Sequence, residues 1–569
     1  MTVVRPPDAA ALVDPVAATP GLRTLGFGAQ QAMPGNTPVG GEGVYSVTAY
    51  GAVPGGDAAA ACTLAIAAAG LTGGTILIPR GDWLWNSVPK IPSGLTGRLM
   101  ITGQPGTKVT LTSGGPRFVD FDRTADYQTF RHVDIRDLVI DCNNVTGTGL
   151  NHVVIGTGVN GSENSQRANF EDISVRRIRT LNVPVTGADR RNVWITSRHV
   201  SAGEATQTHI TDILIEDCDF AGGLYGVTLA ATGGSTGVNV LVDRVIVRRI
   251  NHDLGSDPSG FVGSAHVHIG SRAIGGSCHV HDIWGRGSRD VGIEINALEN
   301  AVIENCTMTN CNGFYYLHVN YATPTNPDAQ TITFRNCHAR WTAGTHVADA
   351  SGFLGCINTG GVTLGRVIVR ACSMIKTTSD WTSDGTAIKV SGAMKGLHVD
   401  GFTYSEPNLS ITTASINPTT FYLQPATLTP LSLRNVRVRI AGVISGGTIS
   451  QAAVFGIYGS SVLDWDNIEV NISGIAAGNH QIRGFNIGQV TGSVLGPSLV
   501  RRAKFTITDA TTPDLFRIYG VTPLTINGTL LISEPDFSGV TSPGNEIEAA
   551  TGVENLDKVV QVKNGVVVP

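Results

Sequence analysis

Short runs in which apolar and polar residues alternate recur between residues 264 and 320. Three of them are Ala265–Ile269 (AHVHI), Val291–Ile295 (VGIEI) and Tyr315–Val319 (YYLHV). This alternation is the period-2 pattern of a half-buried β-strand. The step from the second histidine of the first run to the glutamate of the second is 26 positions, and the next step is 24. A nearly constant step of this size predicts stacked supersecondary units, one strand per coil.

The alternation also predicts which side chains share the outer face of these three strands. If Val267, Ile293 and Leu317 point inward, then His268, Glu294 and His318 form one outward row. Neighbouring strands lie ~4.8 Å apart, so these side chains are expected to touch. A second outward row is expected beside the first one, formed by His266, Gly292 and Tyr316.

Two further strand sets extend the same repeat along the chain. In one set Asp or Asn recurs just past the strand, where a polar side chain can hydrogen-bond a tight turn. Its members include Phe130–Ile135, Thr211–Asp217, Asn300–Asn305, Thr331–Asn336 and Gly365–Arg370. The other set contains the three runs above together with Asn192–Ile195, Gly226–Leu229 and Thr386–Val390. Beyond residue 410 the repeat is less regular, but Val436–Ile440 and Ala503–Thr508 still predict strands.

Composition agrees with a chain made mostly of turns and buried strands. Glycine accounts for 70 of 569 residues and charged residues for 15%, below the usual ~25%. The net charge of -5 gives no electrostatic case for nucleic acid or an anionic membrane. No apolar run reaches 18 residues and the first thirty residues lack a signal-peptide pattern, so we expect no membrane insertion and synthesis in the cytoplasm.

The nine cysteines do not form a disulfide framework, since their number is odd and no CxxC is present. Cys218, Cys306, Cys337 and Cys372 occupy one place in the repeat, which predicts an interior ladder of free thiols. The alternative is a metal site, but its ligands must surround the ion, and these sulfurs are expected to lie in a line. We therefore expect neither metal nor cofactor.

Residues 44–111 carry a resemblance to a known family. Val44–Val53 is followed by Gly55–Asp57, an alanine-rich helix over Ala58–Ala69 that Asp57 is placed to cap, and then Gly73–Trp83 (GGTILIPRGDW). This succession resembles the start of pectate-lyase-like right-handed parallel β-helices, including phage tailspikes. The usual acidic pair before the helix is replaced by alanines. Residues 18–32 resemble the N-terminal connecting segment of phage tail fibres, with Phe27 and Met33–Pro34 as departures.

The resemblance implies an all-β right-handed parallel β-helix with a short N-terminal capping helix and a smaller C-terminal β region. The implied domains are a virion-attachment segment over residues 1–42, the start of the β-helix over 43–115, the central β-helix over 116–430 and a C-terminal β region over 431–569 that serves trimerisation. The implied location is the phage tail. The implied partners are a bacterial cell-surface polysaccharide, two further copies in a homotrimer, and other tail proteins bound through the N-terminus.

The predicted outward row suits hydrolysis of a glycosidic bond, which needs two carboxyl groups. Glu294 is the first of these, with His268 and His318 beside it. Asp290 is the candidate for the second, although it lies ~13 Å from Glu294 if the strand is straight. Asp253, Asp257, Asp189 and a carboxylate of a neighbouring subunit stay open as alternatives.

Aromatic and amide side chains around this row form the expected sugar-binding set, because such groups suit pyranose rings. Its members are Trp194, His266, Tyr316, Asn296, Asn320 and Tyr321. Two other functions stay open beside a hydrolase. A non-catalytic glycan-binding fibre needs no carboxylate pair, and a polysaccharide lyase would use His268, His318 or Tyr316 as its base, with Arg272, Arg286 or Arg289 facing a uronate.

Overall fold

The computed structural model describes most of the chain beyond residue 42. The described residues are 43–113, 117–145, 152–157, 167–185, 190–198, 207–232, 240–255, 264–270, 275–296, 298–319, 326–342, 352–358, 363–377, 379–380, 386–411, 419–444, 452–473, 481–487, 493–508, 512–518, 524–540, 547–549, 553–554, 556–564 and 566–568. They fall into two compact units. Unit 1 contains residues up to 198, 208–226 and 249–252, and unit 2 contains 199–207, 227–248 and 253–569.

Strands make up nearly all of the regular structure. The first part of the chain contains β1 (Val44–Ser46), β2 (Gly74–Ile78), β3 (Gly81–Trp85), β4 (Lys90–Ile91), β5 (Leu99–Gly103), β6 (Thr107–Leu111), β7 (Val119–Phe121), β8 (Gln128–Asp141), β9 (His152–Gly156), β10 (Ala168–Val183), β11 (Arg190–Arg198), β12 (Thr208–Gly222), β13 (Tyr225–Thr232) and β14 (Val240–Asp253).

The middle of the chain continues with β15 (Ala265–Ile269), β16 (Ser277–Ile295), β17 (Asn300–Glu304), β18 (Thr307–Val319), β19 (Thr331–Arg335), β20 (His338–Trp341), β21 (Leu354–Asn358), β22 (Leu364–Arg370), β23 (Ser373–Lys376), β24 (Ser379–Asp380), β25 (Ile388–Gly392), β26 (Met394–Asp400), β27 (Thr403–Ile411) and β28 (Thr419–Pro425).

The last part contains β29 (Thr429–Ile444), β30 (Ala452–Ile457), β31 (Ser461–Ser473), β32 (Gln481–Ile487), β33 (Val494–Leu495), β34 (Ser498–Ile507), β35 (Thr512–Ile518), β36 (Leu524–Ile526), β37 (Leu530–Ser533), β38 (Asp536–Val540), β39 (Ile547–Ala549), β40 (Val553–Glu554), β41 (Val559–Lys563) and β42 (Val566–Val568). These strands beyond residue 431 also pair in parallel; the last pair, β41 with β42, is antiparallel.

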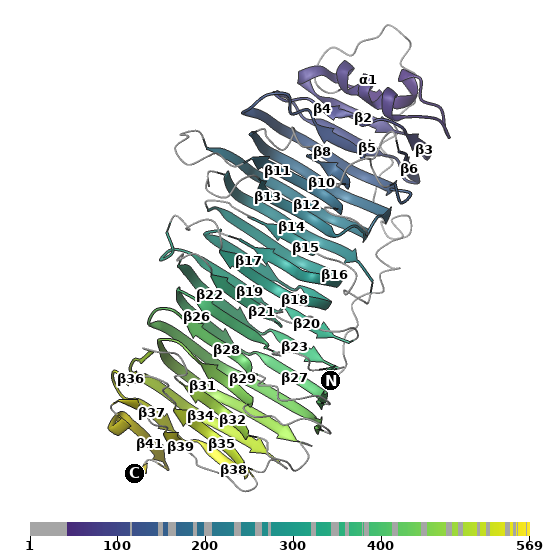
Figure 1. The fold of residues 1–569 in the computed structure, drawn as a ribbon. Coiled ribbons are helices and arrows are strands. Elements are labelled where there is room, and N and C mark those ends of the chain that lie inside the picture. Colours follow the sequence, from purple (N-terminus) through teal and green to yellow (C-terminus); the bar gives the residue numbers. More distant parts are fainter. Residues whose placement is uncertain are drawn as a thin grey trace. The chain divides into compact units, whose positions relative to one another are not determined.

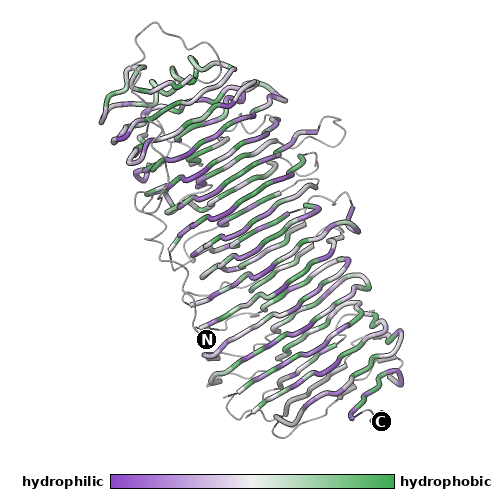
Figure 2. The backbone as a smooth tube through the Cα atoms, turned by 180° about the vertical axis from the view of Figure 1, so that it is seen from behind, coloured by the Kyte–Doolittle hydropathy of each residue, from purple (hydrophilic) through white to green (hydrophobic). Residues whose placement is uncertain are grey.

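Within each unit a strand pairs in parallel with the strand at the same place in the next coil. In unit 1, β10 lies between β8 and β12, and in unit 2, β16 lies between β15 and β18. Figure 2 shows hydrophilic and hydrophobic positions alternating along these strands, as the period-2 pattern predicts. The fold is therefore an all-β, right-handed parallel β-helix, as the resemblance implied.

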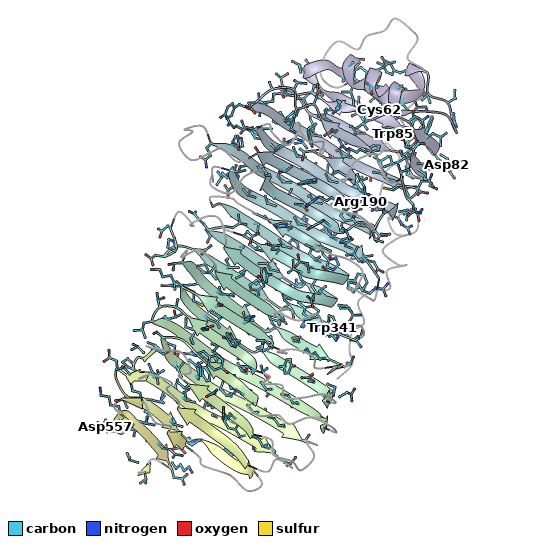
Figure 3. All side chains as sticks on the ribbon, viewed as in Figure 1. Cys62, Asp82, Trp85, Arg190, Trp341 and Asp557 are labelled. Atoms are coloured by element: carbon cyan, nitrogen blue, oxygen red, sulfur yellow. The ribbon has the colours of Figure 1, made fainter. Side chains whose placement is uncertain are left out.

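The helix α1 (Ala59–Ala69) covers the first coils of unit 1, over β2 and β5 (Figure 1). Asp57 Oδ1 accepts a hydrogen bond from the backbone N–H of Ala59 at 3.0 Å, which satisfies a donor that the first turn leaves unpaired. One side of α1 is buried, including Cys62, and Trp85 lies near the same end of the unit (Figure 3). Three short 3-10 helices complete the helical structure of the described residues: Val47–Tyr50, Gly70–Thr72 and Leu556–Lys558.

Stacked side chains from successive coils form the core of each unit. In unit 2, an aromatic column runs through Phe421, Phe455, Phe485 and Phe505, with ring centroids 4.8, 5.1 and 5.5 Å apart. Aromatic pairs at such separations add ~0.5–1.5 kcal/mol each beyond the area that they bury. All nine cysteines are free and buried, so the prediction of interior thiols is confirmed. No helix in the described part of the chain is long and apolar enough to cross a membrane.

Polar residues in the left-handed backbone conformation mark a recurring turn between strands. In unit 1 the turn positions are Asp137, Arg177, Asp217 and Arg249, with φ between 51° and 61°. Each arginine forms two hydrogen bonds with the aspartate of the preceding coil. Arg177 donates to Asp137 at 2.6 and 2.9 Å, and Arg249 donates to Asp217 at 2.5 and 3.0 Å. Paired charges thus offset part of the backbone strain, which costs ~1–2 kcal/mol per residue.

In several coils of unit 2 the same turn contains an asparagine, and Asn336 provides a test. Its φ is 51°, and its amide donates to Asn305 Oδ1 at 2.8 Å. We expect Asn336→Ala to lower the free energy of unfolding by about 2 kcal/mol, because the strain stays and the hydrogen bond is lost. Asn336→Gly should cost less, because glycine adopts this conformation without strain. Denaturant unfolding of both variants measures the difference, and equal losses would contradict the assigned backbone cost.

Candidate functional site

Strand register in unit 2 brings His268, Glu294 and Tyr316 into one outward row. His268 of β15 is the in-register neighbour of Glu294 in β16, and Glu294 is the in-register neighbour of Tyr316 in β18. Residues on either side of each of them are buried, so the apolar faces of the three strands fix the direction of these side chains. The row therefore contains an imidazole, a carboxylate and a phenol on three adjacent strands.

Both carboxylate oxygens of Glu294 have neighbours. Asn296 Nδ2 donates a hydrogen bond to Glu294 Oε1 at 2.9 Å and lies 3.2 Å from His268 Nε2. The second oxygen, Oε2, lies 3.8 Å from the same His268 nitrogen. The side chains of His268 and Glu294 keep 16% and 14% of their surface exposed. Glu294 is thus held in position, yet part of it can still meet a molecule from outside.

The charges of two carboxylates affect the pKa of the Tyr316 hydroxyl. Burial, followed by the charges of Glu294 and Asp290, raises the pKa of Tyr316 to about 12. Each of these effects disfavours the negative phenolate. Tyr316 therefore stays protonated near neutral pH and can donate a hydrogen bond. Asp290 itself is exposed, and its charge reaches the same hydroxyl as that of Glu294.

A register shift between Ser288 and Val291 bends β16. The shift occurs in the pairing of β16 with β18, and Gly287 has φ +76°. The chain around Asp290 is therefore not the straight strand on which the separation of ~13 Å depends. The electrostatic effect on Tyr316 and this bend are the two observations that favour Asp290 as the second carboxyl group.

The predicted row differs from the structure at its third member. Tyr316, 22 positions beyond Glu294, takes the place expected for His318, whose own in-register neighbour is Ile357 of β21. The backbone of His318 belongs to β18, but its side chain is outside the described residues. Asn320 and Tyr321 are also outside the described residues.

The predicted second outward row is wrong, because His266 is buried. Its side chain has no exposed surface, and Nε2 lies 3.4 Å from the Cys311 sulfur. Glycine at position 285 makes the room, since a Cβ there would lie 2.4 Å from the His266 ring. Gly292 is buried as well, so neither residue offers a surface to a substrate.

Trp194 belongs to unit 1, where it lies in β11 and is only 4% exposed. The guanidinium of Arg191 lies 4.0 Å from the Trp194 ring centroid and 3.9 Å from that of Tyr225. A cation in this position is attracted to both ring faces. Because Arg191 occupies one face of the ring and Trp194 is buried, we do not assign Trp194 to a sugar-binding platform.

Among the other candidates raised by the sequence, Asp253 and Arg286 are paired with each other. Asp253 accepts two hydrogen bonds from Arg286, at 2.8 and 2.6 Å, which occupies both groups. Asp189, Asp257 and Arg272 lie outside the described residues, and so does the side chain of Arg289. Within the described ranges, no group of three or more His, Cys, Asp or Glu side chains is arranged to hold a metal ion.

Sequence reasoning missed how far the row extends. The strand Thr386–Val390 was identified as a member of the same set, and its Lys389 continues the row beyond Tyr316, as described further below. The signal was present, because lysine occupies in that run the place that glutamate occupies in Val291–Ile295. Matching positions within the repeat, rather than counting residues, would have found it.

No protein-family model matches the sequence, and no curated protein matches it significantly. In fold, the chain is similar to a mutant tailspike protein of E. coli bacteriophage HK620 in complex with a hexasaccharide, at 12% identity and a TM-score of 0.44, over 91% of this chain and 80% of that one. It is also similar to PfbA, a surface adhesin of Streptococcus pneumoniae, at 12% identity and a TM-score of 0.31, over 79% and 92% of the two chains.

A further similar structure is the N-terminal fragment of gene product 12 of bacteriophage Phi29. It is 14% identical, with a TM-score of 0.38, and the match covers 86% of each chain. These likenesses concern the fold alone.

Proposed function

We propose that this chain is a phage tail protein that binds a bacterial surface polysaccharide and hydrolyses it at the row of His268, Glu294 and Tyr316. The observation that carries the hydrolysis is the placement of Glu294. Asn296 donates a hydrogen bond to one of its oxygens and His268 lies 3.8 Å from the other, while part of the Glu294 side chain stays exposed. The resemblance of residues 44–111 and 18–32 to tailspikes and tail fibres supports the location and the substrate class.

In the proposed reaction, two carboxyl groups have different roles. Asp290 donates a proton to the leaving glycosidic oxygen as the bond from that oxygen to the anomeric carbon breaks. Glu294 acts on the anomeric side, where its carboxylate assists the addition of water. The protonated hydroxyl of Tyr316 donates a hydrogen bond to the sugar between them. The separation of the two carboxyl groups decides whether the anomeric configuration is retained or inverted.

The state of Tyr316 disfavours elimination by a lyase. A lyase base must accept a proton from the sugar ring, and a phenol with a pKa of about 12 is nearly always protonated at neutral pH. Arg286, a candidate for neutralising a uronate, is already paired with Asp253. These observations count against a lyase that uses Tyr316 and Arg286, and the product analysis below distinguishes the proposed hydrolysis from a lyase that uses His268 or His318 as its base.

The test is incubation of the purified protein with a panel of capsular and lipopolysaccharide O-chain polymers, followed by mass analysis of the released fragments. Fragments that carry one added water per cleaved bond are expected. Fragments with an unsaturated, ultraviolet-absorbing end would show a lyase instead. Binding without release from any polymer would leave a non-catalytic adhesin as the function.

Tyr316→Phe tests the assigned hydroxyl. We expect kcat/KM to fall by about tenfold, the effect of losing one hydrogen bond worth ~1–1.5 kcal/mol. The shape of the pH profile between about pH 5 and about pH 9 should not change, because this phenol does not ionise there. Initial rates across that range measure both quantities. Loss of a basic limb from the profile would contradict the role of Tyr316 as a protonated donor.

A further inference from the structure

We infer that the row through Glu294 continues along unit 2 as a binding path for several sugar residues, and that Lys389 and Tyr422 form a subsite on it for an acidic sugar. The inference rests on the proposed function and deepens it, since it names a substrate class. It is carried by strand register, by an aromatic pair, by a lysine that forms no ion pair with any described carboxylate and by a buried amide oxygen.

Strand register extends the row without interruption. Beyond Tyr316, the in-register neighbours are in turn Gly355, Lys389, Tyr422, Gly456 and Asn486. Tyr422 is four strands beyond Glu294, a distance of ~19 Å at ~4.8 Å per strand. All of these residues belong to unit 2. An oligosaccharide extended along the row would contact Glu294 and Tyr422 at the same time.

Tyr422 places an aromatic ring on this row, and this ring packs against the buried ring of Tyr458. The rings of Tyr422 and Tyr458 have centroids 4.8 Å apart at an angle of 51°. Hydrogen bonds fix both hydroxyls. Tyr422 donates to Gln424 Oε1 at 2.8 Å, and the Tyr458 hydroxyl lies 3.3 Å from Thr419 Oγ1. Gly456 makes room for the second ring, because a Cβ there would lie 2.5 Å from it. Rings held in this way lose little freedom when a sugar packs on Tyr422.

Lys389 supplies a positive charge beside the Tyr422 ring. Its ammonium lies 6.0 Å from the Tyr422 ring centroid, and its side chain is half-buried. Among the described residues, no carboxylate forms an ion pair with Lys389. By contrast, Lys395 of the same unit is paired with Asp328 at 2.7 Å. A half-buried ammonium on a chain of net charge -5 is the complement of an anionic group on a ligand.

Asn486, two strands beyond Tyr422, independently points to a ligand. Its side chain is 3% exposed, and within the described residues its Oδ1 has no hydrogen-bond partner. A buried acceptor without a donor costs ~1–3 kcal/mol, and a sugar hydroxyl would satisfy it. The row therefore offers an aromatic face, a cation and an open amide oxygen. These groups suit the ring, the carboxylate and the hydroxyls of an acidic sugar.

The experiment compares one polymer with and without its carboxyl groups. An acidic capsular polysaccharide that the protein binds is reduced at its carboxyl groups to the neutral polymer, and the affinity of full-length protein for both forms is measured by calorimetry. We expect the acidic form to bind about tenfold more tightly, the gain from one charge-assisted hydrogen bond. Lys389→Gln should remove this preference, and raising the salt concentration should weaken it in the wild type.

Lys395→Gln is the matched control, because it also removes one lysine charge from unit 2 and should keep the preference. Tyr422→Ala should weaken binding of the acidic and the neutral polymer alike, since it removes the aromatic ring and keeps the positive charge of Lys389. Equal affinity of the wild type for the two forms, or an unchanged preference in Lys389→Gln, would overturn the subsite. Failure of the protein to bind any acidic polymer would overturn it as well.

The outcomes for the subsite and for the proposed hydrolysis are separable. A preference for the acidic polymer that depends on Lys389, without release of fragments, would support the subsite and contradict hydrolysis. Release of fragments that responds to neither Lys389→Gln nor carboxyl reduction would support hydrolysis and contradict the subsite.

Discussion

Replacing Glu294 with glutamine is expected to lower the rate of oligosaccharide release by about 10²–10⁴-fold, the usual contribution of a positioned acid–base group. The amide keeps the size of the side chain and can still hydrogen-bond Asn296, but it cannot act as a carboxylate. Binding of the polysaccharide should stay within a few-fold of the wild type. The measurement is the initial rate of reducing-end formation, together with calorimetric binding of the same polymer.

Two further variants show whether the loss is specific. Asp290→Asn should also lower the rate, because it removes the proposed proton donor. Glu469→Gln, which removes a glutamate paired with Arg437 elsewhere in unit 2, should leave the rate unchanged. Full release by Glu294→Gln would remove the proposed site, and lost binding in that variant would assign Glu294 to substrate recognition.

The second large effect concerns a lysine and a glutamate inside the coils of unit 2. Lys376 and Glu406 are both buried. Each directly follows a residue of an in-register pair, Ile375 and Ser405, on two adjacent strands. Tyr404 donates a hydrogen bond to Glu406 Oε2 at 2.7 Å. We expect Glu406→Leu to lower the free energy of unfolding by about 3–5 kcal/mol, because it leaves a buried ammonium without its counter-charge. Denaturant unfolding measures this loss.

The double variant Lys376→Met, Glu406→Leu should recover most of that stability, since an apolar pair fits a core in which the buried Trp341 is the in-register neighbour of Lys376. If the free energy of unfolding falls equally in the single and double variants, the loss of stability comes from packing and not from the unpaired charge.

The buried lysine also gives a pH dependence with a defined sign. Burial lowers the pKa of Lys376 below 10.5, and the charge of Glu406 opposes this shift. Between the two pKa values the unfolded chain binds more protons than the folded one, so stability rises with pH across that window. The rise should be steeper in Glu406→Leu and absent in the double variant.

The fold could be predicted from the sequence because its signals are local. The succession of turn, helix and Gly-Gly-Thr strand over residues 44–83 has the same meaning wherever it occurs, and the alternation in AHVHI or VGIEI fixes which face is buried. Glu294 was placed correctly on the outer face for that reason. The predicted domain boundaries are not tested by the structure.

The register of the site could not be predicted in the same way. Which residue lies beside Glu294 depends on the length of the coil between β16 and β18 and on the register shift between Ser288 and Val291. Neither follows from the strand pattern, and a difference of two residues decides between His318 and Tyr316. His266 shows a second limit. Alternation assigns it to the face of His268, but Gly285 on the following coil opens space inside for its ring. Such a vacancy exists only once the coils are stacked.

The alternating charges of the unit 1 turns bear on how such a chain can change in length. Removing the single coil that contains Arg177 would bring Asp137 against Asp217, whereas removing two successive coils would bring Asp137 against Arg249 and preserve attraction. Acidic and basic residues thus alternate from one coil to the next. A duplication or deletion that preserves this alternation must involve an even number of coils. Evolutionary lengthening of this part of the protein would then proceed in double steps, although its hydrophobic core repeats with every single turn.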